Sequence, residues 1–129
     1  MSAASSETAR RVLIVEDEML IALMLQDMVA EAGLAVAAIA NTLQAGVELA
    51  GREDVQLAIL DINLNGEEAY PVAEILRTRR IPFIFSTGYA GANVRPEYQA
   101  VPRLIKPYQQ EMLIAAIAAA DAGRPDASR

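Results

Sequence analysis

Short apolar runs alternate along the chain with longer segments in which hydrophobic residues recur at the helical spacing. This alternation is typical of βαβ units, in which helices cover both faces of a parallel sheet. We expect five strands, at residues 11–15, 35–39, 57–60, 83–86 and 103–105. The pattern therefore predicts an α/β protein with one doubly wound, five-stranded parallel sheet.

The segments between these runs predict the helices, at residues 18–32, 43–50, 68–79 and 109–120. Thr42 is the expected N-cap of the second helix, and Gly33 is expected to end the first. The expected buried face of the first helix consists of Leu20, Ile21, Met24, Leu25, Met28 and Val29. The segment 91–98 contains Gly and Pro, which cost about 1 and 3 kcal/mol inside a helix, so any helix there should be short or marginal.

The length of 129 residues supports one domain with a real core. We expect this domain at residues 11–121, with flexible tails at residues 1–10 and 122–129. No export signal or apolar run long enough for a membrane span occurs, so we expect a cytoplasmic protein without a membrane partner. The hydrophobic share of 53% and the charged share of 22% disfavour disordered and fibrous classes.

The composition excludes several kinds of chemistry. Cysteine and histidine are both absent, which removes disulfides, thiolate metal sites and nucleophile pairs with histidine. The net charge of −6 and only 11 Lys and Arg residues disfavour a nucleic-acid partner. Neither G-x-G-x-x-G nor a Walker A motif occurs. Any reaction must therefore use carboxylates, hydroxyls, Lys or Arg.

Four of the five expected strands end in residues that can handle a phosphoryl group. These are Glu16-Asp17, Asp61, Thr87 and Lys106. The carboxyl ends of parallel strands share one edge of the sheet, where open α/β folds place their sites. We therefore expect three carboxylates, one hydroxyl and one ammonium in a single cleft.

Such a cluster needs a cation, because carboxylates about 4 Å apart repel by ~1 kcal/mol per pair in water and ~4 kcal/mol at an effective dielectric constant of 20. Oxygen ligands next to a phosphate favour Mg²⁺. Asp61 stands alone at a central strand end and is the expected nucleophile, which forms an aspartyl-phosphate. Glu16 and Asp17 would hold the metal, while Thr87 and Lys106 would bind phosphoryl oxygens.

Each of these residues also has a simpler interpretation when it is taken alone. Asp61 could form a turn, and Glu16-Asp17 could merely begin a helix. Thr87-Gly88 could be a plain turn, and Lys106-Pro107 could be a solvated strand end. The occurrence of all four together favours the functional interpretation.

In this combination the chain resembles the receiver domains of bacterial two-component response regulators. The resemblance covers about residues 11–121 and is carried by Glu16-Asp17, Asp61, Thr87 and Lys106-Pro107, in order and at the family's spacing. It implies a flavodoxin-like (βα)5 fold with strand order 2-1-3-4-5. It also implies that Asp61 is the phosphoacceptor for a sensor histidine kinase.

The same resemblance implies the details of the site. Asp17, Asp61 and the backbone carbonyl of Asn63 would bind Mg²⁺ directly, and Glu16 would bind it through water. The peptide bond between Lys106 and Pro107 would be cis.

The run Phe85-Ser86-Thr87-Gly88-Tyr89 further resembles the receiver subfamily nicknamed FAT GUY, which is often paired with HWE-type or related kinases. Arg103 stands where many receivers have an aromatic switch residue, and Asn65 stands where they usually have Pro. We expect Tyr89 to be the substitute switch, together with Thr87 and Pro107.

The resulting expectation is a stand-alone receiver that catalyses only its own phosphorylation and dephosphorylation. Its partners would be a sensor kinase or a histidine phosphotransfer protein and an unknown downstream protein, with the receiver a monomer or a weak phosphorylation-dependent dimer. The alternatives are a phosphate sink, a phosphorelay shuttle and a docking module that is never phosphorylated. A haloacid-dehalogenase-like phosphatase is less favoured, because that family needs a second Asp where this chain has Asn63.

Overall fold

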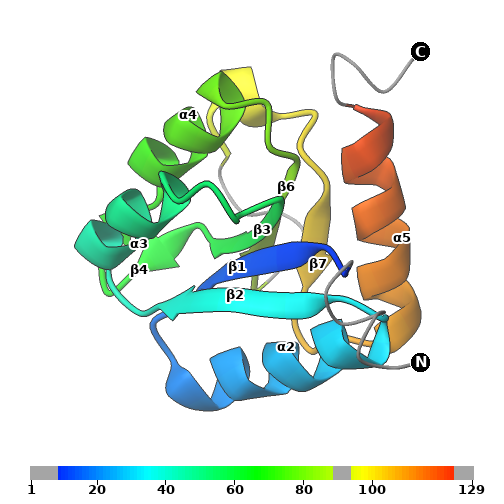
Figure 1. Ribbon diagram of the computed structural model, residues 1–129. Helices are drawn as coiled ribbons and strands as arrows, with labels where there is room; N and C mark the ends of the chain where they lie inside the picture. The colour runs from blue at the N-terminus through cyan, green and yellow to red at the C-terminus, as the bar shows by residue number, and fades with distance from the viewer. Residues whose placement is uncertain (1–8, 89–93, 124–129) are drawn as a thin grey trace.

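One parallel sheet forms the centre of the computed structural model, which describes residues 9–88 and 94–123 (Figure 1). Its strand order is β2-β1-β3-β6-β7, and all neighbours are parallel. The strands are β1 (Arg11–Val15), β2 (Ala35–Ala40), β3 (Leu57–Asp61), β6 (Phe83–Thr87) and β7 (Arg103–Ile105). When the five strands of this sheet are numbered along the chain, the order is 2-1-3-4-5, which confirms the predicted flavodoxin-like fold.

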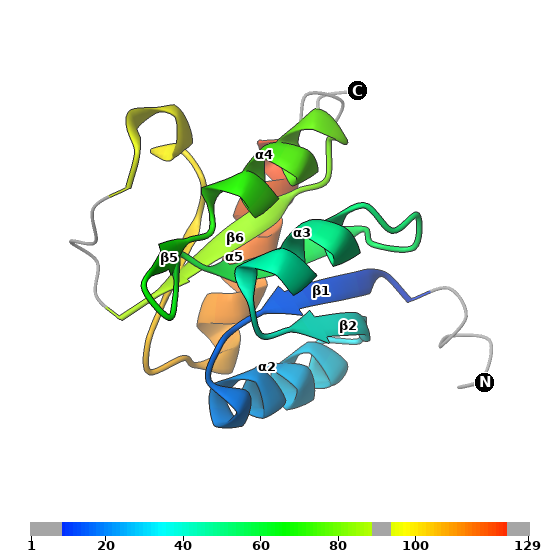
Figure 2. The same cartoon turned by 90° about the vertical axis from the view of Figure 1, so that its left-hand side faces the viewer.

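Two helices cover each face of the sheet (Figures 1 and 2). The helices on one face are α2 (Met19–Glu31) and α5 (Gln110–Ala122), and those on the other are α3 (Leu43–Ala50) and α4 (Tyr70–Thr78). The predicted start of α3 is confirmed, because Thr42 Oγ1 accepts a hydrogen bond from the Ala45 N–H at 3.1 Å. Gly33, with φ of 86°, follows the end of α2 as predicted.

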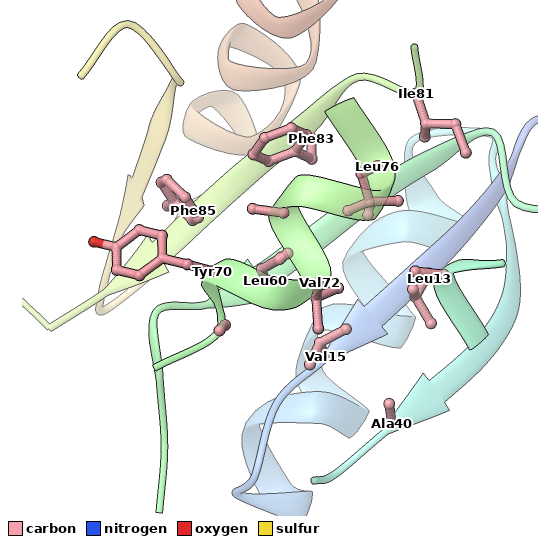
Figure 3. Close-up of a cluster of buried hydrophobic side chains, with 14 of the residues drawn as sticks. Leu13, Val15, Ala40, Leu60, Tyr70, Val72, Leu76, Ile81, Phe83 and Phe85 are labelled. Carbon is pink, nitrogen blue, oxygen red and sulfur yellow. The ribbon is translucent and has the colours of Figure 1, made fainter. Parts of the chain in front are cut away.

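The central strand β3 is buried along its whole length, which explains its continuous apolar run. Side chains that point to one face of the sheet pack against α3 and α4. Figure 3 shows Leu13, Leu60 and Phe85 on the side of the sheet where α4 lies. Those on the other face pack against α2 and α5. Full burial of each large apolar side chain stabilises the fold by about 1.5–3 kcal/mol, so the sheet is a rigid support for residues at its edge.

The predicted start of α4 at Glu68 is wrong, because the chain first forms a small antiparallel hairpin. Its strands are β4 (Asn63–Leu64) and β5 (Glu67–Glu68). Between them, Asn65 and Gly66 have φ of 53° and 89°, the left-handed conformations that a two-residue hairpin turn requires. The helix therefore begins at Tyr70, with Pro71 in its first turn.

The predicted buried face of α2 is wrong at two positions. Leu20 is 83% exposed and Met24 is 40% exposed, whereas Ala22, Leu25 and Val29 are buried. The beginning of α2 is apolar on almost every side, so helical periodicity alone could not identify the face that meets the sheet. Packing against the sheet and α5 determines which face of α2 is buried.

The connection after β6 contains only a short 3₁₀ turn, η1 (Pro96–Tyr98), among its described residues, which confirms the predicted marginal helix. Tyr98 is 5% exposed and stacks on Tyr70 with 5.3 Å between ring centroids. The guanidinium of Arg77 lies 4.2 Å from the Tyr98 ring centroid, and that of Arg95 lies 4.4 Å from the Tyr70 ring centroid. These contacts attach the turn to α4.

Replacement of Tyr98 by alanine is expected to lower the free energy of unfolding by about 3 kcal/mol, because a buried ring and its stacking contacts are removed. Urea unfolding measures this change. Tyr98→Phe keeps the ring and is the matched control, expected to lie within about 1 kcal/mol of the wild type. Equal loss in both variants would contradict an anchoring role for the ring.

Candidate functional site

The predicted site residues lie at neighbouring strand ends along one edge of the sheet. Glu16 and Asp17 follow β1, Asp61 is the last residue of β3, and Lys106 follows β7. Asp61 pairs in register with Ser86, so the end of β6, where Thr87 lies, adjoins the end of β3. The parallel register therefore brings together residues that are far apart in the sequence.

Three carboxylates form a compact cluster at this edge. One carboxylate oxygen each from Glu16, Asp17 and Asp61 lies within 4.8 Å of the others. Glu16 is fully buried and Asp61 is 8% exposed. Glu16 Oε2 accepts a hydrogen bond from the Glu18 N–H at 3.1 Å, but Oε1 is buried and has no hydrogen-bond partner. A buried acceptor without a donor, beside two more carboxylates, fits a cation with oxygen ligands such as Mg²⁺.

The Glu16 carboxyl holds its proton unusually tightly. Burial raises its pKa from 4.5 to about 7, and the nearby charge of Asp61 adds to this effect. The Glu18 N–H and the Lys106 ammonium act in the opposite direction but do not cancel it. Near neutral pH, Glu16 is therefore close to the midpoint of its titration, and a cation that binds to the cluster would favour its ionised form.

Lys106 supplies the positive charge of the site. Its Nζ lies 3.3 Å from Asp61 Oδ2 and 3.8 Å from Glu16 Oε1. Burial alone would lower the Lys106 pKa, but the two carboxylates outweigh burial and raise it. The Lys106 N–H donates to the Thr87 carbonyl oxygen at 2.9 Å, and the peptide bond between Lys106 and Pro107 is cis, as the resemblance implied.

The loop after Asp61 contributes backbone contacts that the sequence analysis missed. The Asn63 N–H donates to Asp61 Oδ1 at 3.1 Å, and the Asn65 N–H donates to Asp17 Oδ2 at 3.0 Å. The Asn-Gly pair at positions 65 and 66 was the available sequence signal for this turn. Proline, whose φ is near −65°, does not fit the φ of 53° at position 65, whereas Asn tolerates this left-handed conformation.

The structure also reveals two further residues at this edge. Ser86 is fully buried on β6, and Tyr108 is 9% exposed at the start of the segment that leads into α5. Their hydroxyl groups share a hydrogen bond. The only sequence signals were a serine within an apolar strand and a tyrosine two residues after Lys106. Of the remaining predicted residues, Thr87 is buried at the end of β6, whereas Tyr89 lies outside the described residues.

A doubly wound sheet of this order, with an acidic cluster and a lysine at its carboxyl edge, defines the class of receiver domains. The chain belongs to the response regulator receiver domain family, whose model matches residues 12–118. Receiver domains are the signalling domains of two-component systems and are not conventional enzymes. Histidine kinases and downstream effector proteins are the partners of this family.

Comparison with individual proteins agrees with this assignment. The solution structure of SdrG from Sphingomonas melonis is 36% identical, with a TM-score of 0.80 over 87% of this chain and 96% of SdrG. The receiver domain of PhyR from Erythrobacter litoralis is 30% identical, with a TM-score of 0.74 over 92% and 94% of the two chains. The transcriptional regulatory protein PdtaR from Mycobacterium tuberculosis is 31% identical over 88% of this chain. The match spans only 58% of PdtaR.

Binding of Mg²⁺ is expected to weaken as the pH falls below about 7, because the Glu16 proton must leave before its carboxylate can face a cation. Well below that pH, the apparent affinity should fall by up to about tenfold per pH unit. Titrations of Mg²⁺ at about pH 6 and about pH 8 measure the change. Glu16→Gln has no proton to lose and should show a much smaller pH dependence. An equal dependence in this variant would assign the effect to another group.

Proposed function

We propose that this receiver accepts a phosphoryl group on Asp61 from the phosphohistidine of a sensor kinase. The observation that carries the proposal is the position of the Asp61 carboxylate, 3.3 Å from Lys106 Nζ and within 4.8 Å of the carboxylates of Glu16 and Asp17. Phosphoryl transfer depends mainly on positioning and electrostatics. A nucleophilic carboxylate beside an ammonium, and beside two carboxylates that could hold a cation, meets these needs. The absence of histidine is no obstacle to this reaction.

In the proposed step, an Asp61 oxygen forms a bond to phosphorus while the bond from phosphorus to the imidazole nitrogen breaks. Lys106 would bind a phosphoryl oxygen with its ammonium, and Thr87 would bind another with its hydroxyl. Asp17, Asp61 and the Asn63 backbone carbonyl would hold Mg²⁺, with Glu16 acting through water. Bound Mg²⁺ would neutralise the charge that develops on the transferred group.

Phosphorylation would act as a switch because it adds about −1.5 to −2 charges at Asp61. We propose that Thr87 and Lys106 move toward this charge and that Pro107 and Tyr89 pass the change to the neighbouring surface. The receiver unit would span residues 11–121 and act in the cytoplasm. Within the described residues, no helix has the length and apolar character needed to cross a membrane.

The test of this function is Mg²⁺-dependent labelling. Incubation with acetyl phosphate and Mg²⁺ should increase the intact mass by one phosphoryl group, and phosphotransfer profiling against histidine kinases, HWE-type kinases included, should identify the donor. An unchanged mass with every donor would instead support the docking module that is never phosphorylated.

The phosphorylated state has two candidate uses, a signal to a partner protein and a phosphate sink that drains a shared kinase. The signalling role is the main proposal, because Lys106 and the end of β6 connect the acceptor to α5 and to the segment after β6. A pull-down with phosphorylated and unphosphorylated protein should retain a partner only in one state. Binding to the kinase alone would favour the sink.

Replacement of Lys106 by alanine is expected to permit some labelling but to weaken the conformational response, because the ammonium would no longer connect the phosphoryl group to β7. The measurement is the set of amide chemical-shift changes that beryllofluoride causes outside the site. Lys106→Met keeps the apolar stem and separates loss of charge from loss of packing. A response of wild-type size in both variants would contradict this role.

A further inference from the structure

The segment that carries Lys106 is attached to β6 at two consecutive positions. The Thr87 carbonyl accepts a hydrogen bond from the Lys106 N–H at 2.9 Å. The preceding residue, Ser86, shares a hydrogen bond with the hydroxyl of Tyr108. Two neighbouring residues of β6 therefore hold both ends of the segment from Lys106 to Tyr108.

The Tyr108 hydroxyl lies within the electrostatic field of the acidic cluster. Burial raises the Tyr108 pKa to about 12, with smaller effects from the charges of Lys106, Glu16 and Asp61. The phenol therefore stays neutral at physiological pH and can take part in a hydrogen bond. The rest of the ring packs in the core between the sheet and the helices α2 and α5.

Ser86 connects this hydroxyl pair to the nucleophile. It pairs in register with Asp61 on one side and with Leu104 of β7 on the other. The lysine ammonium sits on a flexible four-carbon stem, so the position of its backbone limits where the ammonium can lie. The hydroxyl pair attaches Tyr108, two residues after Lys106, to β6, the strand that neighbours β3 and its last residue Asp61.

We propose that the Ser86–Tyr108 hydroxyl pair positions Lys106 against Asp61 and that Tyr108 is thereby a positioning residue for phosphoryl transfer. This inference rests on the proposed function, and it assigns a role to two residues that the predicted site did not contain. The competing explanation is that two buried hydroxyls pair only to satisfy each other, without any effect on Lys106.

A direct test observes the lysine itself. Lys106 is the only lysine in the sequence, so protein with ¹³C-labelled lysine gives one side-chain signal set. In the wild type, the two Hε protons should have distinct chemical shifts because the stem is held in one arrangement. In Tyr108→Phe the two chemical shifts should converge, because the stem becomes mobile. Unchanged separation in Tyr108→Phe would overturn the inference.

This readout needs no phosphorylation, so it separates the inference from the proposed function. Wild-type protein that takes no label would refute the function, while the lysine signals would still decide the inference. Tyr70→Phe is the matched control, because its hydroxyl accepts from the Arg95 N–H at 3.1 Å on the other face of the sheet. The lysine signals of this control should match the wild type, and a change as large as that in Tyr108→Phe would count against a specific connection.

The kinetic test compares labelling rates with acetyl phosphate. Tyr108→Phe should lower the rate by about fivefold, the factor that one ordinary hydrogen bond supplies. In Lys106→Ala, where some labelling remains, adding Tyr108→Phe should have no further effect. An equal fivefold loss in that background would show that Tyr108 does not act through Lys106 and would overturn the inference.

The double variant Ser86→Ala with Tyr108→Phe distinguishes positioning from stability. It removes both hydroxyls, so neither is left buried without the other, and its stability should recover relative to the single variants. Its labelling rate should stay as low as that of Tyr108→Phe. Recovery of the rate together with the stability would mean that the pair only stabilises the fold.

Discussion

Asp61→Asn is expected to abolish labelling by acetyl phosphate and Mg²⁺ without unfolding the domain. The amide has nearly the same shape as the carboxylate but cannot form the acyl phosphate. The replacement relieves repulsion among three carboxylates that lie within 4.8 Å of one another but also removes the ion pair with Lys106, so stability should stay close to that of the wild type. Intact mass measures the labelling, and urea unfolding measures the stability.

The matched control for this change is Asp27→Asn, at an exposed position on α2 outside the acidic cluster. This variant should gain the phosphoryl mass at the wild-type rate. If Asp61→Asn still gained the mass, another residue would be the acceptor and the proposed assignment would be wrong. If labelling disappeared only because the domain unfolded, the urea transition would reveal it.

Asp17→Ala is expected to remove Mg²⁺ binding. It takes away one of three clustered carboxylates, and it also leaves the Asn65 N–H without its acceptor, so the loop after Asp61 loses an attachment. Changes to groups that only orient metal ligands weaken binding by up to about 100-fold, so loss of a direct ligand should cost at least that much. Calorimetric titration with Mg²⁺ measures the affinity.

Glu18→Ala is the matched control for this variant, because Glu18 is the next residue but its exposed side chain makes no cap hydrogen bond to α2. It should bind Mg²⁺ as the wild type does and should be labelled normally. Asp17→Ala should take no label at Mg²⁺ concentrations that saturate the wild type. A Mg²⁺ titration unchanged by Asp17→Ala would place the metal elsewhere.

Much of the site could be predicted because its signals are local. Each strand is a short apolar run, and the residue at its end is visible in the sequence. The parallel arrangement then requires that Asp61 lies near Lys106 and the Glu16-Asp17 pair, as the distances confirm. The N-cap at Thr42 was predictable for the same reason, since a cap depends on residues within one helical turn.

Other features depended on contacts between distant segments. The exposure of Leu20 was not predictable, because only packing decides which side of an apolar helix meets the sheet. The hairpin that precedes α4 had a sequence signal in Asn65-Gly66. The hydrogen bond from the Asn65 N–H to Asp17 was not predictable, because it requires this loop to lie beside the residues that follow β1. The aromatic and guanidinium contacts of Tyr98 likewise join segments that the sequence separates.

The sequence by itself determined the α/β class, the strand positions and the set of carboxylates, hydroxyl and lysine available for chemistry, because these follow from local periodicity and residue type. Only the tertiary structure decided that Glu16 Oε1 is buried without a hydrogen-bond partner and that the Ser86 hydroxyl meets that of Tyr108. Burial and hydrogen bonding between distant residues depend on how the helices pack on the sheet, and no short stretch of sequence contains that information.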